Sequence, residues 1–328
     1  MNRYWQATIE DKASTQLPVN GVNGIYNEHF GLTTVPFSLT PDTQFFFANG
    51  SATDALNTLI VAARSGEGFT KVVGEVGTGK TLLCRLFLDK LSKDRFVTAY
   101  VPNPYLEPMT LLLAIADELG VKYPENPNQH QLLRALSYFL VDTFARGQRT
   151  VVVCLDEAHA MPTESLEALR LLSNLETEKR KLLQIVLFGQ PELDTRLEHP
   201  SVRQLRQRIT FSARMRPMTR EQVAHYVSHR LQVAGYPGER LFTRPALSLL
   251  SRGSLGTPRL VNILAHKALA SAYGEGDDRV RAAHVRLAIQ DTESALEQFR
   301  LAQRRRVAMA GAAASSAVGA AMLLGGWL

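Results

Sequence analysis

Cysteine is scarce in this chain of 328 residues, since only Cys84 and Cys154 occur and each lies inside an apolar run. So few thiols exclude a fold held together by several disulfides, and their apolar neighbours predict buried, unreactive side chains in a reducing cytoplasm. Residues 1–26 lack the apolar stretch of a signal peptide. We therefore predict a flexible N-terminal extension there and no export of the main body.

Neither sign of charge dominates the sequence. The 37 lysines and arginines exceed the 31 acidic residues by 6, a surplus that suits nucleic acid or an anionic membrane but is also common on soluble surfaces. Nucleic acid is therefore not the expected partner. A metal-binding set is also lacking, because His225 and His229 lie four residues apart without a third ligand nearby, which favours surface histidines.

Short apolar runs alternate with amphipathic segments between residues 27 and 216. We predict strands at 70–73, 96–101, 150–156 and 182–189, with helices in the stretches between them. Because these runs are almost entirely apolar, they fit a parallel sheet that is covered by helices on both faces. The predicted fold class is α/β, with a first domain over residues 27–216.

Helical patterns alone follow Pro217. They begin near Thr, Pro or Arg, three of them close on Gly, and they occupy residues 219–235, 243–253, 257–274 and 281–299. We predict a small all-helical domain over 217–298, followed by a basic linker over 299–306.

The segment GEVGTGKT, from Gly74 to Thr81, has the spacing G-x-x-x-x-G-K-T of a phosphate-binding loop between a predicted strand and a predicted helix. Its glycines let backbone N–H groups curl around phosphate oxygens, and the positive end of the following helix points at them. Lys80 would reach the β- and γ-phosphates, and the Thr81 hydroxyl would ligate Mg²⁺. The predicted cofactor-binding residues are Gly74, Glu75, Val76, Gly77, Thr78, Gly79, Lys80, Thr81 and Leu82.

Two acidic residues follow a buried strand in TVVVCLDEAH. Asp156, at the carboxyl end of the strand, would hold Mg²⁺, and Glu157 would position and polarise the attacking water. Such a pair can also cap a helix and start its first turn, but the phosphate loop upstream favours the catalytic interpretation. The predicted metal ligands are Thr81 and Asp156.

Gln190 ends the next predicted strand, where its amide would sense the γ-phosphate beside Glu157. The letters DEAH occur in helicases, but the other motifs of a helicase are not visible in this sequence. An N-K-x-D guanine-recognition motif is also missing. ATP is therefore favoured over GTP as the cofactor, together with Mg²⁺.

Arginines gather in RQLRQRITFSARMRP, residues 203–217. Arg208 is the predicted finger for the γ-phosphate of a neighbouring subunit, a contribution worth about 10³ to 10⁵ in rate, with Arg203 and Arg206 as alternatives. Arg259, at the start of a helix in GTPRLVNIL, is the predicted sensor of the second domain. A solvated basic face, or a patch for a phosphate backbone, is the competing interpretation.

These motifs, in this order, resemble the AAA+ ATPases. More narrowly the chain resembles the ExeA/GspA-like family of secretion ATPases, including its members in biogenesis of mannose-sensitive haemagglutinin (MSHA) pili. The resemblance spans about residues 26–292 and is carried by HFGLTTVPFSLTPDTQFFF (29–47), GEVGTGKTLLCRLF (74–87), AYVPNP (99–104), LDEAHAMPTESLEALRLLSNLETEKRKLLQIVLFGQPELDTRL (155–197), LRQRITFSARMRPMT (205–219) and GTPRLVNILAHKAL (256–269).

The resemblance implies a P-loop AAA+ sheet with a helical lid, and ATP hydrolysis by a homo-oligomer that is a ring or an ATP-dependent dimer. Its catalytic residues would be Lys80, Glu157, Gln190, Arg208 and Arg259. In the family, the aromatic segment within 29–47 would line the adenine pocket. An ordinary aromatic core segment is an equal alternative for it.

The tail at 307–328 carries no charge, and Arg304 to Arg306 precede it. As a helix it would measure about 33 Å, against about 30 Å for the hydrocarbon core of a bilayer. Its many Ala and Gly residues leave an Ala-rich helix docked on protein as the alternative. We predict a single-pass C-terminal membrane helix that holds the ATPase at the cytoplasmic face of the bacterial inner membrane.

Three functions fit these features. The favoured one is a membrane-tethered ATPase that drives or regulates assembly of a type IV (MSHA-like) pilus or a type II-like secretion apparatus, with inner-membrane assembly proteins as partners. The alternatives are an ATP-dependent DNA-binding regulator of the transposition AAA+ type and a slow nucleotide-gated scaffold. The tail favours the first.

Overall fold

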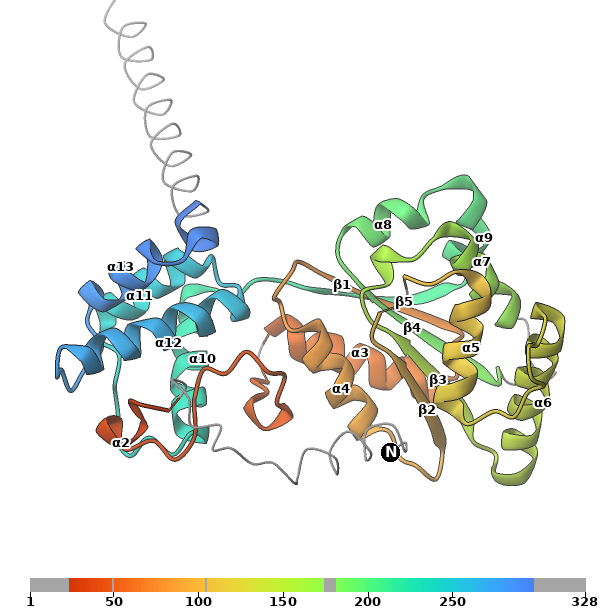
Figure 1. Ribbon diagram of the computed structural model, residues 1–328, viewed down its shortest axis with the longest axis horizontal. Coiled ribbons are helices and arrows are strands. Elements are labelled where there is room, and N and C mark those ends of the chain that lie inside the picture. The colour runs from red at the N-terminus through yellow and green to blue at the C-terminus, as the bar shows by residue number, and fades with distance from the viewer. Residues whose placement is uncertain (1–23, 49, 104, 174–180, 298–328) are drawn as a thin grey trace, which may run out of the picture. The chain divides into compact units, whose positions relative to one another are not determined.

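The computed structural model describes residues 24–48, 50–103, 105–173 and 181–297 (Figure 1). These residues form two compact units, one of residues 41–216 and one that joins residues 24–40 to residues 217–297. The first 23 residues of the predicted extension, the whole basic linker and the predicted membrane helix at 307–328 lie outside the described residues. Tyr26, which the sequence placed in a flexible extension, is fully buried. Within the described ranges, the helices are too short or too polar to cross a membrane.

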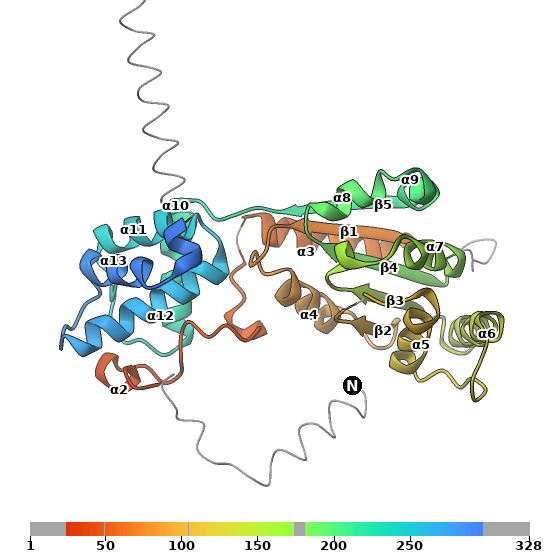
Figure 2. The same cartoon turned by 45° about the horizontal axis from the view of Figure 1, so that its top comes forward.

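A five-stranded sheet forms the centre of the α/β unit. Its strands pair in the order β2-β3-β4-β1-β5 and all neighbours are parallel. Figure 2 shows β2 at one edge and β5 at the other. The bounds are β1 (Phe69–Gly74), β2 (Phe96–Val101), β3 (Thr150–Leu155), β4 (Leu183–Gly189) and β5 (Ile209–Met215). The parallel α/β P-loop fold predicted from the sequence is confirmed.

The four predicted strands are present, and their ends agree with the prediction to within one residue. The edge strand β5 was missed, because its sequence ITFSARM alternates half-buried and exposed side chains along most of its length. Such a strand carries too few apolar residues to stand out from the surrounding arginine run. Its pairing with β1 places it beside the phosphate loop.

Helices cover both faces of this sheet. On one face, α3 (Gly50–Ser65) and α4 (Lys80–Lys90) pack against Val72, Val152 and Phe188. On the other, α5 (Pro108–Leu119), α6 (Gln129–Gly147) and α7 (Thr163–Leu172) pack against the strand residues that point the opposite way (Figure 1). Because successive strand residues alternate between the faces, nearly all-apolar strands were needed to fill both layers.

Both cysteines lie in the first of these layers, where they are fully buried and free. Burial also raises the pKa of the Cys84 thiol. The expected unreactive state of the two thiols therefore matches their surroundings.

Four helices make up most of the second unit: α10 (Arg220–Val233), α11 (Arg244–Ser254), α12 (Pro258–Gly274) and α13 (Ala282–Gln290). Thr219 and Thr243 cap the first two, since each hydroxyl accepts a hydrogen bond from a backbone N–H three residues on. The last predicted helix is interrupted, because α13 ends at Gln290 and a second helical turn begins only after Thr292.

One assignment from the sequence needs correction. Residues 27–40 were placed in the ATPase domain, but they belong to the helical unit. Short helix α2 (Asn27–Phe30) and the segment after it bury Tyr26, Phe30 and Phe37, and Thr33 hydrogen-bonds to the carbonyl of Ala234. Phe30 and Phe37 therefore contribute to the core of the helical unit, whereas Phe45 and Phe46 belong to the α/β unit, and an adenine contact by this segment stays a prediction.

Candidate nucleotide site

The phosphate loop joins β1 to α4, so its backbone passes from the carboxyl end of a buried strand to the positive end of a helix. Gly79 caps α4 with a φ of 95°, a conformation that favours glycine. A Cβ on Gly74 would lie 2.8 Å from Thr78 Oγ1 and 2.9 Å from Met215 Cβ. The loop can therefore keep this close path, beside the edge strand β5, only with glycine at that position.

Lys80 is buried at the base of the loop. Its ammonium donates hydrogen bonds to the carbonyl oxygens of Gly74 (2.7 Å) and Glu75 (3.1 Å). Burial lowers the pKa of Lys80, although the nearby Glu157 and Asp156 carboxylates act in the opposite direction. A polyphosphate beside the loop would supply an anionic partner for this ammonium, so the residue fits phosphate binding.

Thr81 and Asp156 meet although their segments lie 75 positions apart in the chain, since the Thr81 hydroxyl donates to Asp156 Oδ2 at 2.6 Å. Asp156 is 2% exposed and accepts a second hydrogen bond from the backbone N–H of Glu157 at 3.0 Å. Burial raises the pKa of Asp156, and the Thr81 hydrogen bond partly offsets that effect. A hydroxyl and a carboxylate oxygen side by side are hard ligands of the kind that Mg²⁺ takes, so the pair fits this ion.

The sheet order explains why Gln190 lies close to the acidic pair. Strand β4 lies between β3 and β1, so Gln190, just after β4, stands between Glu157 and the phosphate loop. The Gln190 amide nitrogen lies 3.4 Å from Glu157 Oε2 and 2.8 Å from His159 Nε2. Glu157 itself has a φ of 56°, a left-handed backbone that is uncommon for residues other than glycine and costs energy.

Two neighbours of this cluster were missed in the sequence. His159 Nδ1 lies 3.4 Å from Glu157 Oε2, and the Tyr100 hydroxyl donates to Asp156 Oδ2 at 3.4 Å. His159 is the last letter of DEAH, so its proximity to the acidic pair was a usable signal. Tyr100 gave none, because only the pairing of β2 with β3 places it next to Cys154 and hence near Asp156.

The predicted arginines occupy different places. Arg208 caps the end of α7, where its guanidinium donates to the Ser173 hydroxyl at 2.8 Å and to the Arg170 carbonyl at 3.4 Å. Arg203 and Arg206, on α9 (Arg203–Gln207), are exposed and form no ion pair or hydrogen bond with the described residues. Arg259 is exposed in the first turn of α12, in the helical unit.

The sheet order, the loop and the acidic strand end together define a P-loop protein with the AAA+ fold. An independent family comparison agrees, since residues 63–197 match a family described as an AAA domain.

Among known proteins, the chain is similar to general secretion pathway protein A of Aeromonas hydrophila, with 38% identity over 288 residues and 88% of this chain. The aligned part is 52% of that relative, so the chain spans about half the length of the curated protein it matches.

Solved structures agree on the fold. The ORC2 protein of Aeropyrum pernix, in ADPNP and ADP complexes, matches with a TM-score of 0.58 and 18% identity over 77% of this chain and 72% of that one. Cdc6p of Pyrobaculum aerophilum matches with a TM-score of 0.56 and 19% identity over 75% of this chain and 67% of that one. At such low identity, these likenesses extend to the fold alone.

Proposed function

We propose that this chain binds ATP with Mg²⁺ and hydrolyses it to ADP and phosphate. The observation that carries the proposal is the convergence of three chain segments: the Thr81 hydroxyl on the Asp156 carboxylate at 2.6 Å, beside the buried Lys80, with Gln190 reaching Glu157 at 3.4 Å. Each of these groups has a place in phosphoryl transfer to water.

The roles follow from the chemistry of each group. Lys80 and the loop N–H groups would hold the β- and γ-phosphates, and Thr81 with Asp156 would hold Mg²⁺, which would supply positive charge to the phosphate oxygens. Glu157 accepts a proton from the attacking water, and Gln190 links that carboxylate to the γ-phosphate. Because His159 is within reach of both Glu157 and Gln190, it positions the two side chains.

The test of hydrolysis is steady-state phosphate release by the purified chain with and without Mg²⁺. Asp156→Asn should weaken Mg²⁺-dependent release by at least about tenfold, because the metal loses a charged ligand. Asp194→Asn is the matched control, since that carboxylate pairs with Lys71 and Arg214 outside the loop. Phosphate release that does not depend on Mg²⁺, or that both variants lower equally, would contradict the metal assignment.

We further propose that a homo-oligomer, as a ring or an ATP-dependent dimer, shares the site. Arg208 is engaged at the end of α7, whereas Arg206 and Arg203 are exposed two and five residues before it, so one of the three serves as the finger for a neighbouring subunit. Arg259 is the proposed sensor from the helical unit.

Mixing two inactive chains tests the sharing. Glu157→Gln supplies an intact arginine, and a chain with Arg203, Arg206 and Arg208 all changed to Ala supplies an intact carboxylate. Mixed oligomers should recover part of the turnover. If mixed oligomers form and no ratio recovers activity, the finger acts within its own chain or lies elsewhere.

The resulting conformational change drives or regulates assembly of a type IV (MSHA-like) pilus or a type II-like secretion apparatus through inner-membrane assembly proteins. Support comes from the relative named as a general secretion pathway protein and from the motif resemblance. Recovery of envelope assembly proteins with the Glu157→Gln chain, and not with Lys80→Ala, would support this role. If purified partners leave turnover slow and only nucleotide-dependent binding changes, the protein is a nucleotide-gated scaffold instead.

The tail at 307–328 is proposed as the single-pass anchor at the cytoplasmic face of the inner membrane. Its support is the uncharged composition and the three arginines before it. Carbonate should extract a chain ending at Gln303 but not the full chain, and charges introduced at Ala313 and Ala317 should cost a few kcal/mol of insertion. Carbonate release of the full chain, or indifference to both charges, would contradict the anchor.

A second candidate is ATP-dependent DNA binding, and the exposed Arg203, Arg206 and Arg216 favour it. If these arginines neutralise duplex DNA, the affinity should fall steeply with salt and should fall again when the three are changed to Ala. Weak binding that the three substitutions leave unchanged would remove this candidate.

A further inference from the structure

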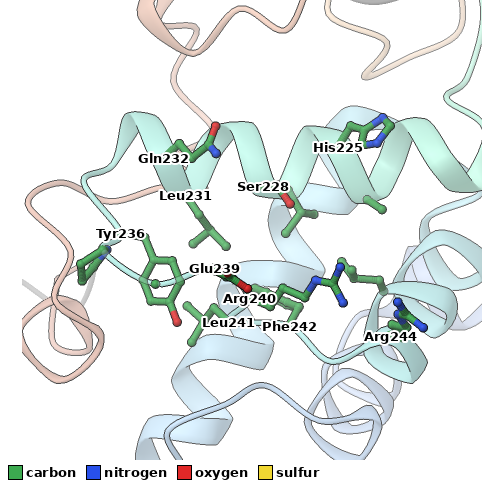
Figure 3. A pocket seen from close by; sticks show the side chains of 15 residues that line it. His225, Ser228, Leu231, Gln232, Tyr236, Glu239, Arg240, Leu241, Phe242 and Arg244 are labelled. Carbon is green, nitrogen blue, oxygen red and sulfur yellow. The ribbon is translucent and has the colours of Figure 1, made fainter.

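The helical unit contains a cavity of about 490 Å³ that nucleotide chemistry does not use. It lies between α10 and the segment 236–247, which leads into α11 (Figure 3). Its volume falls inside the range of about 300–1,000 Å³ that is typical of ligand pockets. We call this cavity the α10 pocket.

The floor of the α10 pocket is apolar. Val227 and Leu231 from α10, and Leu241 and Phe242 from the facing segment, are all buried side chains that line it. Leu247 and the half-buried Tyr236 extend the same surface. An apolar side chain entering the pocket would therefore leave water for a complementary surface.

The rim of the pocket is basic. Arg240, Arg244 and His225 are exposed around the opening, and Glu239 is the one acidic residue among those that line it. Neither arginine forms an ion pair or a hydrogen bond with the residues that the structure describes. In Figure 3 the Arg240 and Arg244 side chains lie toward the His225 end of α10, whereas Tyr236 lies toward the Gln232 end.

We propose that the α10 pocket binds a short acidic peptide segment of a partner protein. An apolar side chain of that segment occupies the end near Tyr236 and Leu231, and neighbouring carboxylates pair with Arg240 and Arg244. Arginine suits this role because its planar guanidinium donates two parallel hydrogen bonds to one carboxylate and stays protonated at neutral pH.

The shape of the opening favours a peptide over a compact metabolite. His225, Ser228 and Gln232 follow each other at intervals of three and four, so they lie on one face of α10 along about 10 Å of helix. An extended chain covers that length in about three residues, which places one apolar and one or two acidic side chains along the pocket.

This proposal goes beyond the proposed ATPase function. All the lining residues fall within 224–247, in the helical unit, and none belongs to the phosphate loop or to the ends of β3 and β4. A Lys80→Ala chain should therefore still bind the peptide, so failure of one proposal does not imply failure of the other.

The experiment selects random 12-residue peptides displayed on phage against the immobilised full chain. The enriched sequences should combine Asp or Glu with one Leu, Ile, Phe or Tyr. A fluorescein-labelled synthetic copy of the strongest peptide then gives affinities by fluorescence anisotropy. Arg240→Glu combined with Arg244→Glu should weaken binding at least tenfold, because both charges are reversed.

Two further variants sharpen the result. Ser228→Trp should block the cavity and weaken binding at least tenfold without any change in charge. Arg279→Glu combined with Arg286→Glu makes the same charge change at exposed positions of the helical unit outside the pocket, and should alter binding less than twofold. Circular dichroism melts of each chain show whether the helical unit is folded.

Several outcomes would overturn the proposal. These are the absence of enriched peptides, enrichment of peptides without acidic residues, and binding that the folded Arg240→Glu, Arg244→Glu chain retains. If the chain instead binds a labelled single-stranded oligonucleotide, and the Arg240→Glu, Arg244→Glu chain does not, the basic rim binds nucleic acid and not an acidic peptide.

Discussion

In the α/β unit two charged side chains are buried near the carboxyl ends of strands, whereas in the helical unit a buried arginine joins the N-terminal segment to the helices. The two charged side chains are Lys80 and Asp156, and both have pKa values displaced by burial against their charged forms. The arginine is Arg230, and it donates to the Pro36 carbonyl and the Tyr226 hydroxyl, which in turn donates to Asn262.

The difference shows which polar groups are arranged for a ligand. The Arg230 network satisfies its members within one unit, so its main effect is to hold the chain together. Burial opposes the charged forms of both Lys80 and Asp156, and in the proposed function phosphate and Mg²⁺ are the partners of these two groups. Removal of a polar side chain from the Arg230 network should therefore lower the stability of the protein. Removal of one from the nucleotide site should instead lower the affinity for the ligand and leave the stability unchanged or higher.

The largest effect is expected at the phosphate loop. Lys80→Ala should weaken ATP binding at least about 100-fold, because a charged hydrogen-bond donor to phosphate is lost, while the melting temperature should stay unchanged or rise as a buried ammonium disappears. Lys71→Ala is the control, since Lys71 lies on β1, the strand that leads into the loop, but pairs with Asp194. Calorimetric titration and thermal unfolding check both parts, and a large loss of stability without a loss of affinity would reverse the interpretation.

The next effect concerns the backbone of the helical unit. Gly256 has a φ of 74°, and a Cβ there would collide with the Met218 carbonyl group, whereas Gly276 has a φ of 71° and open space around it. Gly256→Ala should therefore cost about 3 kcal/mol of unfolding free energy or more, against about 1 kcal/mol for Gly276→Ala. Urea unfolding followed by circular dichroism measures the difference, and equal costs would contradict the packing at Gly256.

A smaller loss of unfolding free energy is expected when the Arg230 network is broken. Arg230→Met removes the donor to the Pro36 carbonyl and to Tyr226, so it should lower the unfolding free energy by about 2 kcal/mol and expose residues 24–40 to protease. Arg220→Met, at an exposed position of the same helix, provides the control. Should both variants resist protease equally, the N-terminal segment does not depend on Arg230.

The smallest expected effect is a pH dependence. The Tyr26 hydroxyl lies 2.7 Å from His266 Nδ1, and burial, followed by the charge of Lys267, lowers the pKa of His266. His266 therefore binds a proton more readily in the unfolded chain than in the folded one. The stabilisation that neutral His266 contributes is present above about pH 6.5 and is lost as the pH falls below that value. His266→Asn should flatten the fall in unfolding free energy on acidification, and an identical slope in both chains would exclude His266 as its source.

The sequence predicted the parts of the fold whose signals are local. Strands β3 and β4 are buried along nearly their whole length and so form nearly continuous apolar runs, and the loop from Gly74 to Thr81 has fixed spacing. Edge strand β5 was missed because exposure on one face lets polar residues alternate along it. Residues 27–40 were misplaced because only long-range contacts, such as Thr33 with Ala234, decide which unit they join.

The candidate site shows the same limit. The carboxyl ends of parallel strands meet at one edge, so the grouping of Lys80, Asp156, Glu157 and Gln190 followed from topology. The position of Arg208 did not follow, because a long side chain can turn toward the end of α7 or toward a neighbouring subunit without any change in the surrounding sequence. Tyr100 and its hydrogen bond to Asp156 likewise required the strand register.

The claim that these charges serve ATP hydrolysis is tested most directly by Glu157→Gln, with ATP affinity and phosphate release measured on the same preparation. In the part of the chain that the structure describes, Glu157 lies near Gln190 and His159 and forms no hydrogen bond or ion pair with Lys80, so the variant should bind ATP within about twofold of the unchanged protein. Its phosphate release should fall at least about 100-fold, because the water loses its general base. Turnover that stays normal in the Glu157→Gln chain, or ATP binding that is lost together with turnover, would contradict the account.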